Sequence, residues 1–343
     1  MKTLQLSELE QDILYVTLMD AGASVVSIAR RIGTKPHIVQ AAVSKFRREG
    51  VISRRVIIDI TRIGFSTHEF FISLSSEGQR AREAVVEYLK RSPWVGTVLE
   101  VGGEYDLMLT VRVRNQREMV EFQTGLSERF PGMFTRKDTS LAVEHWAYGE
   151  KFLVSNPSLY MEYHLQVPPF TVAVDEIDKK ILFEIGDPAF GSMTALARRV
   201  GLPTTTVEYR VKKLAEKKVI LGDLHELRGE LIGLSNYVLL LGMNGVSEAI
   251  NREVCEAARL NPFVPWLSRG AGHWDYVMGL VVRAPSEVPT AVNRLRTSLG
   301  SWMTSYQIVP MFRAHKVRDY PLDPAYEAQA LQQAGLSKNS SIA

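Results

Sequence analysis

Residues 24–33 read SVVSIARRIG and residues 192–201 read SMTALARRVG, two stretches that align without a gap at a shift of 168 positions. The alignment extends over residues 6–52 of the first copy and 174–220 of the second. Each quoted stretch begins with a serine that can cap a short helix and ends with a glycine that can terminate it. The chain therefore carries one unit twice, and we expect the two copies to pair within a single polypeptide.

A helix before each stretch and another after it complete a three-helix pattern. Ser7 and Glu10 predict a capping box at the start of the first helix, and Asp175 caps the matching helix of the second copy. The third helix is predicted over residues 36–49 in the first copy and 203–217 in the second. Two short helices joined by a tight, glycine-containing turn after an initial helix form the helix-turn-helix pattern.

After each three-helix unit the apolar residues alternate, which predicts strands. Residues 51–60 predict a β-rich wing and hinge, and the order that follows is β-α-β-β-α-β, the ferredoxin-like arrangement. The strands are predicted at residues 68–74, 96–101, 105–113 and 134–143, and again at 236–241, 264–269, 274–282 and 304–311. The helices are predicted at residues 78–91, 116–130, 248–260 and 286–299.

The outward residues of the third helix and the basic residues around it predict double-stranded DNA as a partner. A recognition helix reads base edges in the major groove, while basic groups beside it hold phosphates. Basic residues alone more often solvate a helix surface, but here they coincide twice with the same pattern. The candidate DNA-binding residues are Arg30, Arg31, Lys35, His37, Gln40, Ser44, Lys45, Arg47 and Arg48, and in the second copy Arg198, Arg199, Thr204, Thr205, Glu208, Tyr209, Arg210, Lys212 and Lys213.

The composition is that of an ordinary globular protein, with 45% hydrophobic and 23% charged residues among 343. The net charge is only +3, so a DNA-binding surface must come from local basic patches. The N-terminus lacks an apolar stretch of signal-peptide length, and no run of about 18 apolar residues predicts a membrane span. The single Cys255 cannot form an internal disulfide, which favours a cytoplasmic protein. No Cys/His spacing predicts a metal site and no glycine-rich loop predicts a phosphate site, so we expect no cofactor.

Two further motifs connect this pattern to a known family. Residues 202–214 read LPTTTVEYRVKKL, and turns of the form Gly-x-x-Asp occur as GEYD at 103–106 and GHWD at 272–275. In this combination and order the chain resembles the leucine-responsive regulatory protein/AsnC family of transcription regulators, over nearly its whole length. The first copy departs from the pattern, because Ala42 stands where the second copy has Arg210.

The resemblance implies an α+β fold in which two winged helix-turn-helix domains alternate with two ferredoxin-like effector-sensing domains, paired as an internal pseudo-dimer. It also implies a small-molecule effector, such as an amino acid, near the Gly-x-x-Asp turns. Glycine permits a positive φ and lets a ligand approach the backbone closely, and successive backbone N–H groups can hold a carboxylate. A tight turn that binds no ligand would need the same residues. The candidate effector-binding residues are Gly102, Gly103, Glu104, Tyr105, Asp106, Gly270, Gly272, His273, Trp274 and Asp275. Assembly of the pseudo-dimer into larger homo-oligomers stays open.

The expected domain organisation follows from these elements. DNA-binding domains are predicted at residues 1–60 and 174–230, effector domains at 61–155 and 231–320, a linker at 156–173 and a flexible tail with a short helix at 321–343.

The function expected from this organisation is sequence-specific transcriptional regulation rather than catalysis. Two alternatives stay open. A branch of the same superfamily decarboxylates siroheme with histidines near the tetrapyrrole, and His145, His273 and His315 are the histidines that could serve as acid-base groups here. The other alternative is an interaction partner of single-unit relatives that does not itself bind DNA.

Overall fold

The computed structural model describes residues 3–154, 156–187, 191–320 and 322, and the helix predicted in the tail lies outside them. Each DNA-binding unit forms three helices. They are α1 (Glu8–Met19), α2 (Val25–Ile32) and α3 (Pro36–Arg48), and in the second unit α7 (Glu176–Ile185), α8 (Met193–Val200) and α9 (Thr204–Glu216). The capping boxes at Ser7 and Asp175 are present. Gly33 and Gly201 end α2 and α8 with the same left-handed backbone, φ 77° and ψ 34°, which disfavours residues with a Cβ.

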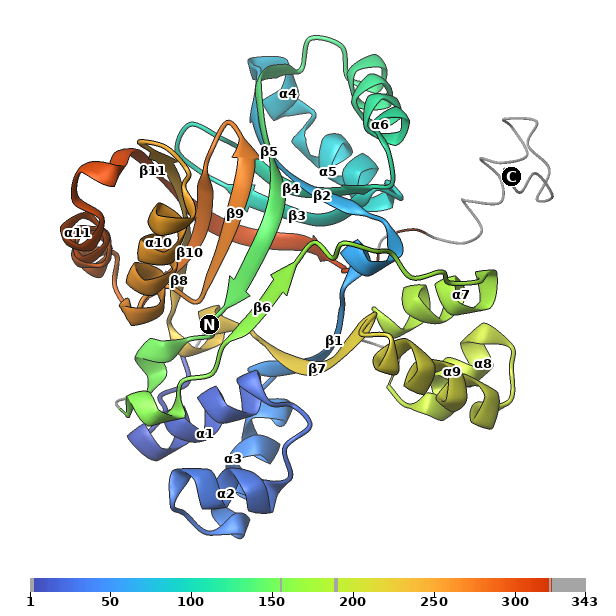
Figure 1. Cartoon of the computed structure of the whole chain (residues 1–343), viewed down its shortest axis with the longest axis vertical. Coiled ribbons are helices and arrows are strands. Elements are labelled where there is room, and N and C mark those ends of the chain that lie inside the picture. The colour runs from blue at the N-terminus through green and yellow to red at the C-terminus, as the bar shows by residue number, and fades with distance from the viewer. Residues whose placement is uncertain (1–2, 155, 188–190, 321, 323–343) are drawn as a thin grey trace.

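The segments that follow the helix-turn-helix units pair with each other rather than within their own domains. Strand β1 (Ile52–Ile58) runs antiparallel to β7 (Ile220–Leu227). Leu227 packs into the core around α1–α3, while Val56 and Ile58 belong to the core around α7–α9. The predicted hinge is therefore a two-stranded ribbon that holds both DNA-binding units on one side of the molecule (Figure 1).

Both ferredoxin-like units have the predicted β-α-β-β-α-β order, reached from the ribbon through the short helices η1 (Ile60–Ile63) and η5 (Gly229–Ile232). The first consists of β2 (Ser66–Leu74), α4 (Ser76–Arg80), α5 (Arg82–Arg91), β3 (Val95–Val101), β4 (Leu107–Val113), α6 (Gln116–Arg129) and β5 (Phe134–Ala147). The second consists of β8 (Ser235–Met243), α10 (Glu248–Leu260), β9 (Trp266–Gly272), β10 (Tyr276–Val282), η6 (Pro285–Glu287), α11 (Val288–Leu299), η7 (Gly300–Trp302) and β11 (Met303–Val317). The helix predicted at 78–91 divides at Ala81, whose φ of −97° and ψ of 9° leave the α-helical region.

The sheets of the two ferredoxin-like units close into one barrel. The strand order is β2-β4-β3-β11-β8-β10-β9-β5, and β5 also pairs with β2. Strand β5 leaves β2 at Ala142 and continues along β9 of the second copy. Strand β11 likewise pairs with β8 up to Met311 and then with β3. Both strands are longer than predicted because each continues along the other copy's sheet.

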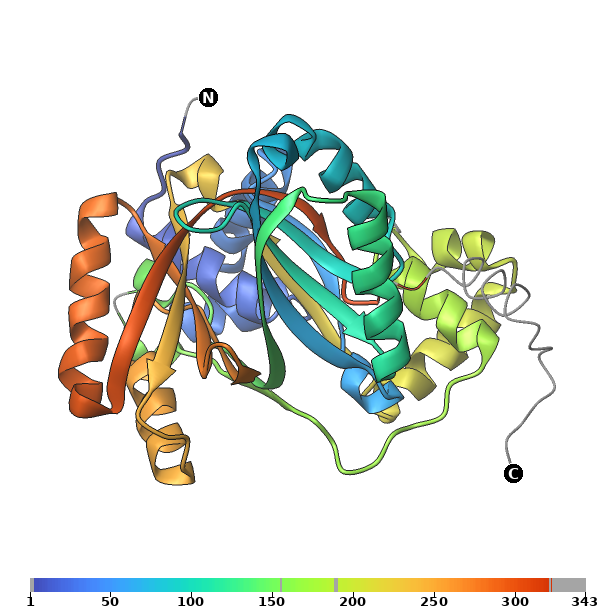
Figure 2. The same cartoon turned by 90° about the horizontal axis from the view of Figure 1, so that it is seen from above.

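The core lies in three layers. Helices α5 and α6 cover the outer face of the first sheet, and α10 and α11 cover that of the second (Figures 1 and 2). The barrel interior joins the copies, with Phe71 and Tyr105 from the first packed against Leu240, Val277 and Val309 from the second. This shared interior confirms that the fold is an internal pair of ferredoxin-like units.

The linker is structured over its first part. After β5 come η2 (Lys151–Leu153), η3 (Pro157–Leu159) and strand β6 (Tyr163–Gln166), which pairs back with the end of β5. In Figure 2 the following segment sweeps around the outside of the barrel toward α7. The first part of the linker is therefore held against the first copy by the pairing of β6 with β5, and only the part after β6 is a plain connection to the second copy.

Candidate nucleic-acid interface and sensor turns

Helix α3 exposes the residues predicted to face DNA in the first copy. Val39, Val43 and Phe46 are buried in the helical core, as their spacing predicts. The opposite face exposes His37, Gln40, Ser44, Arg47 and Arg48, and the Gln40 side-chain amide donates to the Ser44 hydroxyl at 3.1 Å. A Gln or Arg on such a face can make bidentate contacts with bases in the major groove.

Helix α9 presents a face of different chemistry. Val207 and Leu214 are buried, while Thr205, Glu208, Lys212 and Lys213 are exposed and Thr204 is half-buried. Tyr209 is 62% exposed, with the Lys213 ammonium 5.7 Å from its ring centre. The outward faces of α3 and α9 therefore differ in chemistry.

Two of the predicted DNA contacts are engaged in clamps within their own domains. The Lys45 ammonium lies 2.7 Å from Glu10, and the Arg210 guanidinium lies 2.8 Å from both Asp175 and Asp178. Each clamp ties the recognition helix to the first turn of the domain's first helix. Lys45 thus does in the first copy what Arg210 does in the second, although the alignment places Ala42 opposite Arg210. The structure therefore gives both residues a structural role, and their contact with DNA stays a prediction.

The basic pairs that end α2 and α8 are partly engaged as well. Arg31 donates to the Leu159 carbonyl at 3.2 Å, and Arg199 lies 3.2 Å from Asp187. Arg30, Lys35 and Arg198 are exposed beside the recognition helices. In the ribbon, Arg54 pairs with Asp223 and Arg55 with Asp319, so these two charges stabilise the junction of the copies.

Both Gly-x-x-Asp turns use their aspartates as structural anchors. Asp106 accepts hydrogen bonds from the Leu74 backbone N–H at 2.7 Å, from Gln79 at 2.6 Å and from Arg82 at 2.7 Å. Asp275 accepts from the equivalent Met243 N–H at 2.7 Å. The carboxylates therefore fix the turns, and any ligand contact must come mainly from the other turn residues.

Each turn packs against the other copy's last strand. Gly102 N–H donates to the Pro310 carbonyl at 2.9 Å, and Gly103 has a φ of 83°. At Gly272, a Cβ would lie 2.5 Å from the Thr139 carbonyl oxygen, so this contact requires glycine. The next β9 glycine, Gly270, faces the same strand, where a Cβ would lie 3.3 Å from Ser140.

Polar side chains of both Gly-x-x-Asp turns meet residues of β5 where the copies join. The buried Tyr105 hydroxyl donates to Asp138 at 2.5 Å, and Arg136 lies 2.5 Å from Asp138 and 2.8 Å from Glu104. His273 is 43% exposed at its side chain and lies 3.8 Å from Asp138. The Trp274 backbone N–H donates to the Ser140 hydroxyl at 2.9 Å. The predicted effector residues therefore meet residues of β5 that sequence reasoning did not select.

The barrel interior also contains a polar cluster that the sequence did not reveal. Glu69 on β2 is 5% exposed, and burial raises its pKa to about 7, partly offset by a hydrogen bond with Ser268 of the second copy. The Ser268 hydroxyl lies 3.2 Å from Nδ1 of His145, whose pKa is lowered to about 4 by burial. An acidic residue within an apolar strand was the available signal, but its hydrogen-bond partner Ser268 lies 199 positions away in the sequence.

The three histidines considered for catalysis lie in three separate environments. His145 faces the barrel interior, His273 lies in the exposed turn, and His315 lies 3.3 Å from Glu100 at its side chain. In the described residues no group of three His, Cys, Asp or Glu side chains is placed to hold a metal ion. The same residues contain no helix that is long and apolar enough to cross a membrane.

Comparisons with known proteins agree with this architecture. A family of winged helix-turn-helix DNA-binding domains matches residues 174–220. An uncharacterized HTH-type transcriptional regulator of Pyrococcus abyssi is 29% identical over 153 residues, which are 44% of this chain and 96% of the relative. The AsnC family transcriptional regulator from Agrobacterium tumefaciens is 21% identical, with a TM-score of 0.38 over 45% of this chain and 99% of that one.

One solved structure spans both halves. The siroheme decarboxylase NirDL, in complex with an iron-uroporphyrin III analogue, covers 96% of this chain and 100% of its own with a TM-score of 0.58. Its identity is 12%, so the likeness shows the fold alone. The Pyrococcus abyssi relative matches 44% of this chain over 96% of its own length, which agrees with the doubled sequence. The chain is therefore similar to HTH-type transcriptional regulators over 44% of its length, with a winged helix-turn-helix DNA-binding match at residues 174–220 and a matching three-helix unit in its first half.

Proposed function

We propose that the protein is a sequence-specific DNA-binding transcriptional regulator whose activity responds to a small-molecule effector. The observation that carries this proposal is the β1–β7 ribbon, which holds two exposed recognition helices, α3 and α9, on one side of a single barrel. Two helix-turn-helix units fixed in this way can engage two half-sites on one face of a duplex, about 34 Å or a multiple apart. Because the outward residues of α3 and α9 differ, the operator need not be palindromic.

Footprinting on the DNA upstream of the protein's own gene, followed by gel shifts at several salt concentrations, tests the proposal. We expect two unlike protected half-sites and an affinity that falls steeply with salt, because phosphate contacts release counterions. Arg47→Ala and Lys212→Ala, one on each recognition helix, should each weaken binding, whereas Arg117→Ala on the distant α6 should not. Equally weak binding to every sequence at physiological salt would contradict specific regulation.

The effector is proposed to bind near the Gly-x-x-Asp turns, where Glu104, Tyr105, His273 and Trp274 surround Asp138 and Arg136. A zwitterion such as an amino acid suits this mixture of acidic, basic and aromatic groups. Titrating amino acids while following Trp274 fluorescence tests the site, with His273→Ala as the altered variant. Retention of the full response in that variant would remove this turn from the proposal.

A catalytic alternative rests on the whole-chain likeness to siroheme decarboxylase. Against it stands the separation of His145, His273 and His315 into three environments, because paired acid-base catalysis requires groups that reach one substrate. A spectroscopic titration with siroheme discriminates the two functions. Tight binding of one tetrapyrrole per chain would favour the enzyme over the regulator.

A further inference from the structure

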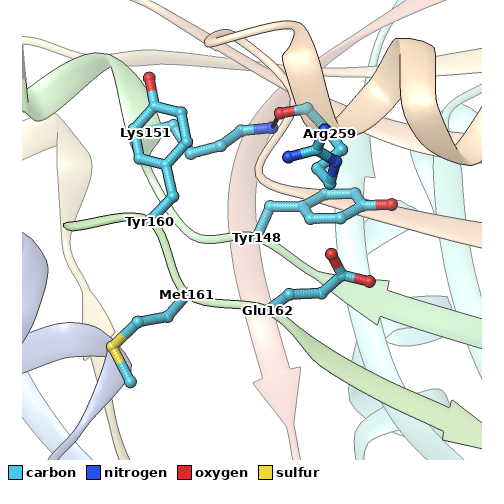
Figure 3. A pocket seen from close by; sticks show the side chains of 6 residues that line it. All are labelled: Tyr148, Lys151, Tyr160, Met161, Glu162 and Arg259. Atoms are coloured by element: carbon cyan, nitrogen blue, oxygen red, sulfur yellow. Dashed lines mark hydrogen bonds between the residues drawn. The ribbon is translucent and has the colours of Figure 1, made fainter. Parts of the chain in front are cut away.

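A small cavity lies where the chain leaves β5 and crosses toward the second half (Figure 3). Its volume is about 90 Å³, and it is lined by Tyr148, Lys151, Tyr160, Met161 and Glu162 of the crossing segment and by Arg259 near the end of α10. The lining therefore combines the segment that joins the copies with a sensor helix of the second copy. None of the Gly-x-x-Asp residues contributes to it.

Lys151 is a buried cation at this cavity. It is 1% exposed, and its ammonium donates to the carbonyls of Ala258 at 2.7 Å and Arg259 at 2.8 Å. An ammonium carries three N–H donors; these carbonyls satisfy two of them, and the Tyr148 ring centre lies 4.4 Å from the ammonium nitrogen. Among the residues that the structure describes, no carboxylate pairs with it, and burial, with a contribution from Arg259, lowers its pKa to about 7. A buried ammonium without a counterion is destabilising, and an anion beside it would relieve that cost.

The other charges at the cavity define what kind of anion fits. In the view of Figure 3, Arg259 and Glu162 lie on either side of the Tyr148 ring. Arg259 also pairs with Glu256 at 2.6 Å but remains 46% exposed at its side chain. The neighbouring Glu150 does not neutralise Lys151, because burial raises its own pKa to about 7 and no ion pair joins the two in the described part of the chain. The cavity lining thus contains two cationic side chains, Lys151 and Arg259, and one carboxylate, Glu162, while Glu256 pairs with Arg259 from outside the lining.

We propose that this cavity binds a small carboxylate of about the size of acetate or glycine, held by Lys151 and Arg259. A cavity with a volume of about 90 Å³ has room for a ligand of a few non-hydrogen atoms. The Glu162 carboxylate lies where it can accept from an ammonium group, so an amino acid would gain a second contact. Tyr148 and Tyr160 supply aromatic walls.

The site is in contact with the first DNA-binding unit. The Met161 N–H donates to the Tyr15 hydroxyl at 3.1 Å, and that hydroxyl donates to the Tyr148 carbonyl at 3.0 Å. Tyr15 is a fully buried residue of α1, and the Tyr160 ring lies 6.3 Å from its ring. A bound carboxylate would therefore fix the three cavity residues that hold α1. This site differs from the sensor turns, which occur in both copies.

Isothermal titration of the full chain with sodium acetate, glycine and methylammonium tests the assignment. At pH 7, in two buffers with different heats of ionisation, acetate and glycine should bind with uptake of up to about half a proton, because a neighbouring anion raises the pKa of a partly deprotonated lysine. Methylammonium, which has no carboxylate, should not bind. Binding of methylammonium, or of glycine without acetate, would overturn recognition through the carboxylate.

Two variants separate the site from the fold. Lys151→Met should abolish both acetate binding and proton uptake. Arg259→Gln, at a partly exposed side chain, should weaken the affinity for acetate by about tenfold and leave the circular dichroism spectrum unchanged. Arg228→Gln, an exposed arginine outside the cavity, is the matched control and should bind as the parent does. Absence of acetate and glycine binding in the parent protein, or full binding in both cavity variants, would refute the proposal.

Discussion

Replacing Glu69 with glutamine should change how the stability of the barrel depends on pH. Glu69 is buried between the copies, and its pKa is about 7 in the folded chain against a reference value of 4.5. Folding therefore favours the protonated form, so this residue's contribution is complete below pH 4.5 and is lost as the pH rises to 7. Since one pKa unit corresponds to 1.36 kcal/mol, the loss amounts to about 3 kcal/mol.

His145 acts in the opposite sense. Its pKa is about 4 in the folded chain against 6.5, so folding favours the neutral imidazole and stability is lost as the pH falls from 6.5 to 4. Between pH 4.5 and 6.5 the unfolded chain carries the proton on His145 while the folded chain carries it on Glu69. The two contributions cancel there, and each single variant exposes the other.

Chemical denaturation at pH 4, 4.5, 5.5, 6.5 and 7, followed by the fluorescence of the barrel tryptophans, measures the effect. Relative to the parent, Glu69→Gln should gain about 3 kcal/mol of unfolding free energy between pH 4.5 and 7. His145→Asn should instead gain on acidification from pH 6.5 to 4. A difference between Glu69→Gln and the parent that stays constant across this range would show that the carboxyl is not held protonated by burial.

Three further predictions concern the clamps, the turns and the cavity. Arg210→Met should destabilise the second DNA-binding unit by about 1 kcal/mol in thermal denaturation, because two partly exposed ion pairs are lost. The control Arg198→Met should leave the stability unchanged. Equal unfolding midpoints for the two variants would show that Arg210 does not stabilise the domain and is available to contact DNA. Gly272→Ala should lower the unfolding free energy by about 1–3 kcal/mol, because its Cβ would lie 2.5 Å from the backbone of β5. Gly222→Ala, at a glycine with positive φ but open space around it, should lower it less. Similar losses in both variants would attribute the effect to φ alone. Lys151→Met should remove the carboxylate-linked proton uptake measured by titration calorimetry, and uptake that persists would place the proton elsewhere.

Much of the fold could be predicted from the sequence because its signals are local. Capping residues, helix-ending glycines and apolar periods act within a few positions, so the helix-turn-helix units and the β-α-β-β-α-β order were predictable twice over. The lengths of β5 and β11 were not, because alternation cannot show which neighbouring strand a residue pairs with. The burial of Val39, Val43 and Phe46 followed from spacing, whereas the engagement of Lys45 with Glu10 depends on how two helices are rotated against each other.

The sequence by itself determined that this protein is a doubled unit, with a DNA-binding pattern and a sensor pattern in each half. Only the tertiary structure decided how the halves combine: β1 pairs with β7, β5 and β11 cross between sheets, and Ser268 of the second copy contacts both Glu69 and His145 of the first inside the barrel. The same holds for the cavity at Lys151, whose walls come from residues about 100 positions apart. The physical reason is that helix and strand formation depend on neighbours in the chain, whereas hydrogen-bond partners, buried charges and cavities depend on neighbours in space.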